Sequence, residues 1–322
     1  IMSIRLYLIY HKQGYLPSSR ILTPIQVGVA LDEREFLEGK LKDCDGDNIS
    51  TKNRSYCELT AQYWAWKNDT ADYYGFFHYR RYLSFDPNSL MDYTNSQKVK
   101  RSPLPYRIYK RPDEQTLNLL GYTEENIKDI IGRYDIIAPL AEQMHVSVYD
   151  HYKKAPFHHI EDLDLVLKII EQRYPEFKAA AQEYMAGTKH YFCNMFVMKR
   201  ELFFNYCAWL FSILQEFDRQ TDFTKYSGKA CRVDGYLGER LFGVYYTWLK
   251  KQSTVRWAEL PRVHFEAFPG ETDNFWLMKR VNMFLPPGTR RRAYAKKLLG
   301  LTLGRRNSIL TISKESERNI KG

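Results

Sequence analysis

Two adjacent arginines follow an apolar segment and form the first candidate for chemistry. Residues 73–77 predict a buried strand, and they lead directly into the run His78-Tyr79-Arg80-Arg81. The carboxyl edge of an open α/β sheet is where a ligand crevice lies, and guanidinium groups bind phosphate oxygens through two parallel hydrogen bonds. We therefore expect this run to contact a diphosphate. Neighbouring strand residues point to opposite faces, so one of the two arginines alone would reach the ligand. The alternative is that both bridge surface carboxylates.

Further polar side chains lie near the expected first strand, residues 4–10. His11 and Lys12 follow this strand directly, and Asn48 and Asn53 belong to a polar loop farther along the chain. Their position after a buried strand favours contacts with a bound nucleotide. We expect all four to contribute to such a site.

Side chains suited to sugars occur in two later segments. Asn194 lies within the apolar stretch 191–198, where a buried amide must be hydrogen-bonded, and a sugar hydroxyl is one partner among many. Tyr152, His158 and His159 belong to a histidine-rich segment whose spacing fits no standard zinc site. Neutral histidines and tyrosines suit a groove for an acceptor sugar, and packing at a domain edge is the competing explanation.

Alternating strands and helices must position these residues. Apolar periodicity predicts strands at 4–10, 73–77, 134–138, 191–198, 256–260 and 263–265, and helices at 56–68, 126–133, 160–173, 202–217 and 235–249. This order predicts an α/β domain with a mainly parallel sheet over residues 1–270. Residues 86–122 contain four prolines and little periodicity, which is typical of an insertion or a mobile loop.

The charge is concentrated at the carboxyl-terminal end. Residues 279–322 hold twelve Lys and Arg and two Glu, a formal charge of +10 that equals the +10 of the whole chain, so the remainder is close to neutral. Apolar residues lie beside these cations, which suits an anionic membrane surface at about 1 kcal/mol per cation near the lipid. A solvated terminus is the alternative for this segment, 271–322. The near-neutral charge of the rest of the chain argues against nucleic acid as a partner.

Cysteine content and hydropathy indicate the compartment. The five cysteines never occur as CxxC, which favours reduced thiols and no structural zinc site. No run of about 18 apolar residues predicts a membrane-spanning helix, and the amino-terminal residues lack a secretory pattern. We expect a cytoplasmic protein at the inner face of the cell membrane.

The sequence resembles a bacterial family first catalogued as a domain of unknown function. The resemblance rests on Tyr56-Cys-Glu-Leu-Thr-Ala, on Tyr-x-Gly-x-x-His-Tyr-Arg-Arg-Tyr ending at Tyr82, and on segments 24–28, 46–50, 191–198 and 236–242. Members occur in capsule, exopolysaccharide and O-antigen gene clusters and are classed as glycosyltransferases. Membership implies a Rossmann-like fold of the GT-A type, and relatives transfer galactofuranose from UDP-galactofuranose with β-1,3 linkage. Within the matched motif, Glu58 is expected to contact the nucleotide-sugar.

The resemblance also implies a mechanism. Many inverting GT-A enzymes have an acidic general base at the start of a comparable helix and a basic residue farther along it, and Asp234 and Arg240 resemble this pattern. Asp234 is the first candidate for the base and Glu239 the second. Asp234 could equally cap the helix, and Glu239 could equally form an ion pair with Arg240. Most GT-A enzymes hold a divalent metal with Asp-x-Asp, which is missing from the His78-Tyr79-Arg80 run, so we expect transfer that needs no Mn²⁺ or Mg²⁺.

Together these observations predict a glycosyltransferase that uses a UDP-sugar donor and a lipid-linked saccharide acceptor. A non-catalytic glycan- or nucleotide-binding component of a polysaccharide assembly complex is the alternative. Such a component would bind sugar and release no UDP. A nucleic-acid-binding protein is the least favoured alternative, because it is suggested by charge alone.

Overall fold

The computed structural model describes residues 2–32, 35–93, 106–267 and 275–285, together with isolated positions from 289 to 298. The chain divides into two compact units, Ile1–Phe275 and Trp276–Gly322. In the second unit, most of what is described belongs to helix α10, Phe275–Phe284. Within the described residues, no helix is long and apolar enough to cross a membrane.

One sheet forms the framework of the first unit. Its strands follow the order β3-β2-β1-β4-β11-β8-β12-β6, while β5 pairs with β4 and β13, and β7 pairs with β13. The strands are β1 (Ile4–Tyr10), β2 (Leu22–Gln26), β3 (Leu41–Lys42), β4 (Tyr73–His78), β5 (Arg81–Leu83), β6 (Met91–Asp92), β7 (Tyr106–Tyr109), β8 (Ile136–Pro139), β11 (Phe196–Lys199), β12 (Trp257–Leu260) and β13 (Arg262–Phe265). Strands β9 (Glu142–Gln143) and β10 (Lys189–His190) form a separate antiparallel pair.

The expected α/β fold is confirmed, and its sheet is mixed. Strands β3, β2, β1 and β4 are parallel to one another. The next strand, β11, runs antiparallel to both β4 and β8. Two further pairs, β8 with β12 and β7 with β13, are parallel.

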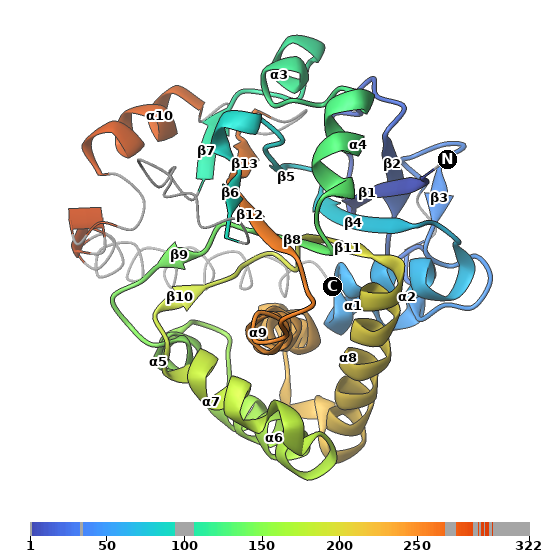
Figure 1. Cartoon of the computed structure of the whole chain (residues 1–322). Coiled ribbons are helices and arrows are strands. Elements are labelled where there is room, and N and C mark those ends of the chain that lie inside the picture. The colour runs from blue at the N-terminus through green and yellow to red at the C-terminus, as the bar shows by residue number, and fades with distance from the viewer. Residues whose placement is uncertain are drawn as a thin grey trace, which may run out of the picture. The chain divides into compact units, whose positions relative to one another are not determined.

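Helices cover both faces of this sheet. They are α1 (Asn53–Tyr56), α2 (Leu59–Asn68), α3 (Glu114–Leu119), α4 (Glu124–Gly132), α5 (Val148–Lys154), α6 (Ile160–Arg173), α7 (Lys178–Ala186), α8 (Arg200–Gln220) and α9 (Val233–Leu249), with short 3₁₀ turns at Ser50–Lys52, Pro87–Ser89, Pro175–Phe177, Phe223–Lys225 and Gly228–Arg232. Figure 1 shows α5–α9 on one side of the strands and α3 and α4 on the other.

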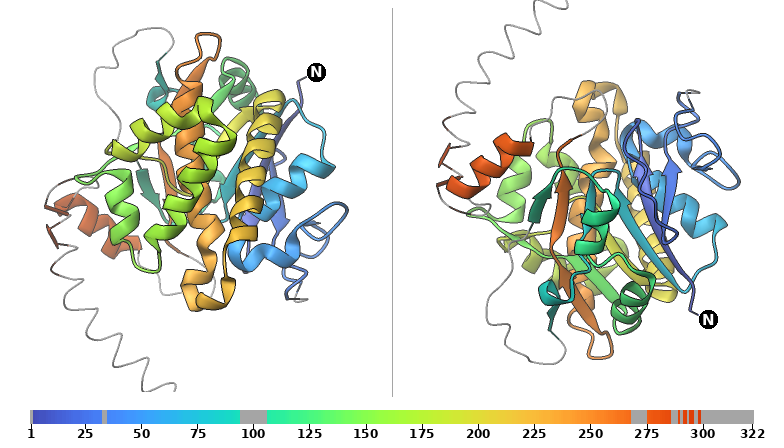
Figure 2. Two further views of the ribbon diagram at one scale, coloured as in Figure 1. Left: turned by 90° about the horizontal axis from the view of Figure 1, so that it is seen from below. Right: turned by 90° about the horizontal axis from the view of Figure 1, so that it is seen from above.

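Alternation along the strands produces two separate cores. In β1, Tyr7 and Ile9 belong to the core that contacts α2 and α5–α9, whereas Leu6 and Leu8 belong to the core under α3 and α4. Helix α9 lies between α7 and α8 and packs on both (Figure 2). Burial on both faces explains why the strand sequences are almost continuously apolar.

The helix expected at residues 56–68 is interrupted. Cys57 has φ 52° and separates α1 from α2. The Asn53 side-chain amide donates a hydrogen bond to the Cys57 carbonyl at 2.7 Å, which stabilises the reversed backbone. The break turns Cys57 and Glu58 toward the end of the sheet.

Residues 86–122 contain more regular structure than their prolines suggest. The described part includes β6, β7 and α3, and both strands join the main sheet. Residues 94–105 of the expected loop lie outside the described residues. Strand pairing organises this segment although its own sequence has little periodicity.

Candidate active site

A cleft lies at the carboxyl ends of β1, β2 and β4. Its larger part is a cavity of about 270 Å³ lined by Ile9, His11, Val27, Asn53, Arg54, Cys57, Glu58, His78 and Arg232. A smaller part, of about 70 Å³, is lined by Cys57, Glu58, His78, Arg81, Cys193, Arg232, Gly235, Tyr236 and Glu239. We call these the outer and inner cavities. Because β2 and β4 flank β1 on opposite sides, the cleft lies at a topological switch point, where α/β folds bind ligands.

A buried carboxylate organises the loops beside the outer cavity. Asp43 is 0% exposed and accepts hydrogen bonds from the backbone of Gly28 (2.9 Å) and Val29 (3.3 Å). The hydroxyls of Ser50 and Thr60 also donate to it, each at 2.6 Å. Four donors offset the free-energy cost of removing the charge from water. Asp43 thereby joins the loop after β2 to the start of α2.

The close approach of two loops explains one glycine here. Gly28 has φ +74°, and a Cβ at this position would lie 2.6 Å from the side-chain oxygen of Asn53. Asn53 lines the outer cavity, as expected, and its amide holds the Cys57 turn. Asn48 instead stabilises its own loop, donating to the carbonyls of Cys44 and Gly46 at 2.8 Å each.

The two arginines of the sequence motif separate at a hairpin turn. His78 in β4 pairs with Arg81 in β5, so Tyr79 and Arg80 form the turn between them. Arg81 lines the inner cavity, whereas the Arg80 guanidinium lies 5.7 Å from the centre of the Tyr79 ring. The structure thus brings one of the two arginines to the cleft.

Histidines and tyrosines form the end of the sheet next to these cations. The rings of His11 and His78 are 5.6 Å apart, and Tyr79 packs edge-on to His11 at 5.2 Å. Desolvation and the neighbouring cations, Arg232 among them, lower the pKa of His11 to about 4 and that of His78 well below 6.5. Both imidazoles are therefore neutral at pH 7. Lys12 lies 5.9 Å from the Tyr79 ring, and neither Lys12 nor Tyr79 is among the lining residues.

Helix α9 forms the opposite wall of the inner cavity. A Cβ at Gly235 would lie 3.1 Å from the Cys57 sulfur, and one at Gly238 would lie 2.8 Å from Leu59. These glycines allow α9 to pack closely on the turn at Cys57. Glu239 consequently reaches the cavity, where its carboxylate accepts hydrogen bonds from the Cys193 backbone N–H and from Arg240, each at 2.7 Å.

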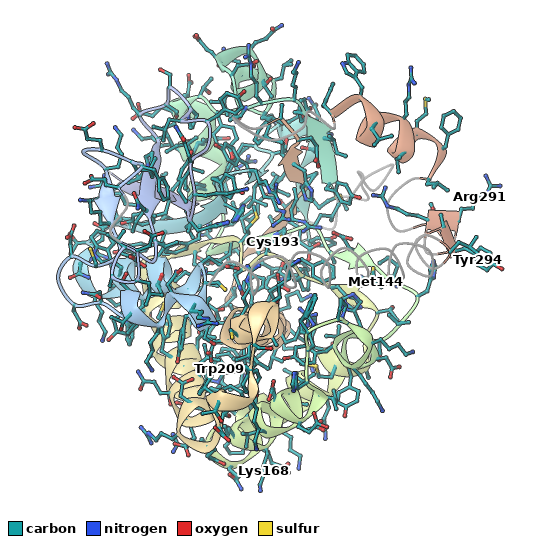
Figure 3. All side chains as sticks on the ribbon, turned by 180° about the vertical axis from the view of Figure 1, so that it is seen from behind. Met144, Lys168, Cys193, Trp209, Arg291 and Tyr294 are labelled. Atoms are coloured by element: carbon teal, nitrogen blue, oxygen red, sulfur yellow. The ribbon has the colours of Figure 1, made fainter. Side chains whose placement is uncertain are left out.

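A strained turn completes this wall. Residues 191–198, expected as one strand, contain a turn in which Cys193 and Asn194 both have positive φ, 79° and 48°. Asn194 is 2% exposed, and its amide donates to Glu58 Oε1 at 2.9 Å and to the Gly235 carbonyl at 3.1 Å. Consecutive left-handed residues other than glycine are uncommon and cluster at functional sites. In the view of Figure 3, Cys193 lies near the centre of the first unit.

Asp234 does not line either cavity. It is 0% exposed, accepts a hydrogen bond from the Ser55 hydroxyl and lies beside Asp218. Burial, followed by the negative charge of Asp218, raises its pKa well above 3.8. A carboxyl group that lines neither cavity does not reach an acceptor in the cleft, so this conformation does not support the first candidate for the base.

The expected acceptor residues lie beyond the inner cavity. Tyr152 is fully buried and packs on His158, whose ring is 4.1 Å from that of Tyr236, a lining residue. Arg240 is 2% exposed and lies 5.4 Å from the Tyr152 ring. His159 instead packs against Tyr226, away from this group. His158 is thus the member nearest to the cleft.

Residues 5–252 match the family model described as "Domain of unknown function (DUF4422)". The match covers well over half of the chain. The chain belongs to the DUF4422 family. This confirms the resemblance to a family catalogued as a domain of unknown function.

This DUF4422 chain is also similar to a solved structure, the apo form of the bifunctional glycosyltransferase WbbM. The TM-score is 0.72 and the sequence identity 33%, over 83% of this chain and 46% of that one. The DUF4422 chain therefore spans less than half the length of WbbM. A comparison with curated proteins finds no match.

Two arginines that line the cleft have different signals in the DUF4422 sequence. Arg54 and Arg232 line the cleft but were not expected there, although Arg232 directly precedes the helix expected near Asp234. A basic residue just before a helix that starts at the cleft would have been the signal. Within the described part of the chain, no three His, Cys, Asp or Glu side chains cluster as metal ligands.

Proposed function

We propose that the protein is a glycosyltransferase that moves a sugar from a UDP-sugar to a lipid-linked glycan during capsule, exopolysaccharide or O-antigen synthesis. One observation carries this proposal. A cleft at the switch point of the sheet combines Arg81 and Arg232 with two carboxylates, Glu58 and Glu239, in a 70 Å³ cavity. Cations for a diphosphate and a carboxylate for an acceptor hydroxyl are what sugar transfer from a nucleotide donor requires. The match to WbbM supports the same class of reaction.

The leaving diphosphate would bind between the arginines. Arg232 lines both cavities and Arg81 the inner one, and Arg54 lines the outer one. Guanidinium groups stabilise the negative charge that develops as the glycosidic bond to phosphate breaks. At the end of β4, guanidinium groups do not fit a divalent cation, so we propose transfer independent of Mn²⁺ and Mg²⁺.

The nucleoside would occupy the outer cavity. His11, Val27 and Asn53 line it, and the network around Asp43 holds two of the loops that carry them. The acceptor would approach from the side of Tyr236 and His158. We propose galactofuranose as the transferred sugar, with inversion to a β linkage, in keeping with the resemblance found in the sequence.

The second unit would bring the enzyme to the membrane. Four large side chains of α10 are more than 60% exposed: Trp276, Leu277, Met283 and Phe284. Trp276 and Leu277 directly precede the strongly basic segment 279–322, and Met283 and Phe284 lie within it. Apolar and cationic groups together favour an anionic lipid surface. Deletion of residues 279–322 should release the protein from anionic liposomes in a sedimentation assay, and undiminished binding would contradict this role.

A donor screen tests the proposed reaction directly. UDP release is measured for a set of UDP-sugars with a lipid-linked saccharide acceptor, with and without EDTA. We expect release with UDP-galactofuranose that EDTA leaves unchanged. Release from another donor would correct the sugar, and loss with EDTA would contradict metal independence. No release from any donor would favour a binding component.

A further inference from the structure

The transferred sugar has to lie where the two cavities meet. The lining residues that they share are Cys57, Glu58, His78 and Arg232. Of these, Glu58 alone has a carboxylate. We infer that Glu58 is the general base and that Asn194 is its positioning residue, an inference that rests on the proposed sugar transfer.

The contacts of the two cavity carboxylates separate their roles. Glu239 is held at both oxygens, by the Cys193 N–H and by the guanidinium of Arg240. Glu58 accepts the Asn194 hydrogen bond at Oε1, at 2.9 Å, and lines both cavities. An ion-paired carboxylate is a weaker base than one that faces the reacting groups. Glu239 therefore anchors the turn at Cys193, and Glu58 acts on the acceptor.

The imidazole at the junction, His78, is less suited to accept a proton. Burial disfavours the charged ring, and the positive charges of Arg81, Arg80 and Arg232 add to this effect. A carboxylate gains from the same cations while it is ionised. Burial raises the pKa of Glu58 above its ordinary value, and the Asn194 hydrogen bond offsets part of this rise.

The reaction step balances without any further reactant. The acceptor oxygen attacks the anomeric carbon of the donor while its proton moves to the Glu58 carboxylate. The bond between that carbon and the diphosphate oxygen breaks, and its electron pair leaves with UDP. Arg81 and Arg232, which line the inner cavity with Glu58, stabilise the departing charge.

The strained turn gives Asn194 its function. A left-handed backbone at φ 48° is one that asparagine adopts more readily than most residues. Gln62 donates a hydrogen bond from its side chain to the Asn194 carbonyl at 3.0 Å, which fixes the turn against α2. The Asn194 amide then bridges Glu58 and the Gly235 carbonyl of α9. Asn194 thus orients the Glu58 carboxylate relative to α2 and α9.

The test replaces Glu58 with a neutral isostere. Glu58→Gln should lower kcat about 10²- to 10⁴-fold, the usual contribution of a general base, while UDP affinity by calorimetry changes less than about threefold. Glu201→Gln, the same change on the exposed surface of α8, is the matched control and should retain wild-type kcat. A kcat within about tenfold of wild type for Glu58→Gln would overturn the assignment.

A second variant tests positioning. Asn194→Gly keeps the left-handed backbone and removes the amide, so the acidic limb of the kcat/KM profile should move to higher pH as the pKa of Glu58 rises. A rate loss without this displacement would indicate a structural role and overturn the positioning assignment. If the wild-type protein releases no UDP, the proposed function fails. An active wild type with an active Glu58→Gln variant refutes this inference alone.

Discussion

Two fully buried aspartates lie behind the two walls of the cleft, and their surroundings differ. Asp43, behind the outer cavity, accepts hydrogen bonds from two backbone N–H groups and two hydroxyls. Asp234, in α9, accepts one from Ser55 and lies beside a second carboxylate, Asp218. Asp43 is thus surrounded by hydrogen-bond donors, whereas burial and the neighbouring charge of Asp218 raise the pKa of Asp234.

The difference shows that burial alone does not identify a catalytic acid or base. Asp43 organises loops that line the donor site, and Asp234 packs α9 against α1. The carboxylates that reach the cleft, Glu58 and Glu239, are only partly buried. Access to the reacting groups, rather than depth, separates the two kinds of residue.

The largest expected effect is the loss of the Asp43 network. Asp43→Ala leaves four buried donors unsatisfied, so the free energy of unfolding should fall by about 3–5 kcal/mol, as when one partner of a buried charged group is removed. Urea denaturation measures the change. Asp45→Ala, at an exposed position of the same loop, is the control and should change it by less than about 0.5 kcal/mol. Similar values for both would contradict the role given to Asp43.

The next largest effect is expected on UDP affinity, at the arginine that lines the inner cavity. Arg81→Ala should weaken UDP about 10- to 100-fold, because charge-assisted hydrogen bonds contribute about 1.5–3 kcal/mol each, and should leave uridine affinity nearly unchanged. Titration calorimetry with both ligands separates the diphosphate from the base. Arg80→Ala, in the adjacent turn, should have a smaller effect. Equal losses for UDP and uridine would remove Arg81 from the diphosphate.

The smallest effect is expected at Asp234. Asp234→Asn should retain turnover within a few-fold, since the side chain lines neither cavity, whereas a catalytic base would lose at least about 10². Steady-state UDP release decides between the two. Abolished turnover with intact UDP binding would restore Asp234 as the base.

The pH dependence of stability provides a second measurement at Asp234. Above 3.8, its ordinary pKa, the folded state holds the proton that the unfolded state loses, so the free energy of unfolding falls as pH rises toward the raised pKa. Asp234→Asn should remove this fall, so that the free energy of unfolding of the variant exceeds that of the wild type at pH 8. Parallel stability profiles for both proteins would show that the pKa is not raised.

Much of the lining of the outer cavity is predictable from the sequence because many of its residues are close together along the chain. The strand at 73–78, the polar residues that follow it and the loop near Asn53 lie within short, strongly patterned segments. The separation of Arg80 and Arg81 depends on the pairing of His78 with Arg81, which a periodic pattern does not specify.

The lining of the inner cavity depends on contacts between segments that are distant in the sequence. Glu58 and Asn194 are 136 residues apart, and Cys193 and Glu239 are 46 apart. Cys57 and Cys193 have positive φ although cysteine has no intrinsic preference for it. Side-chain hydrogen bonds from Asn53 and Gln62 and the packing of α9 stabilise these backbones.

The sequence by itself determined the α/β class, the ligand edge of the sheet and the concentration of positive charge toward the carboxyl-terminal end, because apolar periodicity and charge are local properties of a chain. The tertiary structure decided which carboxylates face the cleft. A side chain at the start of a helix can point into a cavity or into a core, and the direction follows from how closely that helix packs on its neighbours. In α9, Gly235 and Gly238 permit that close packing, which buries Asp234 and brings Glu239 to the cavity.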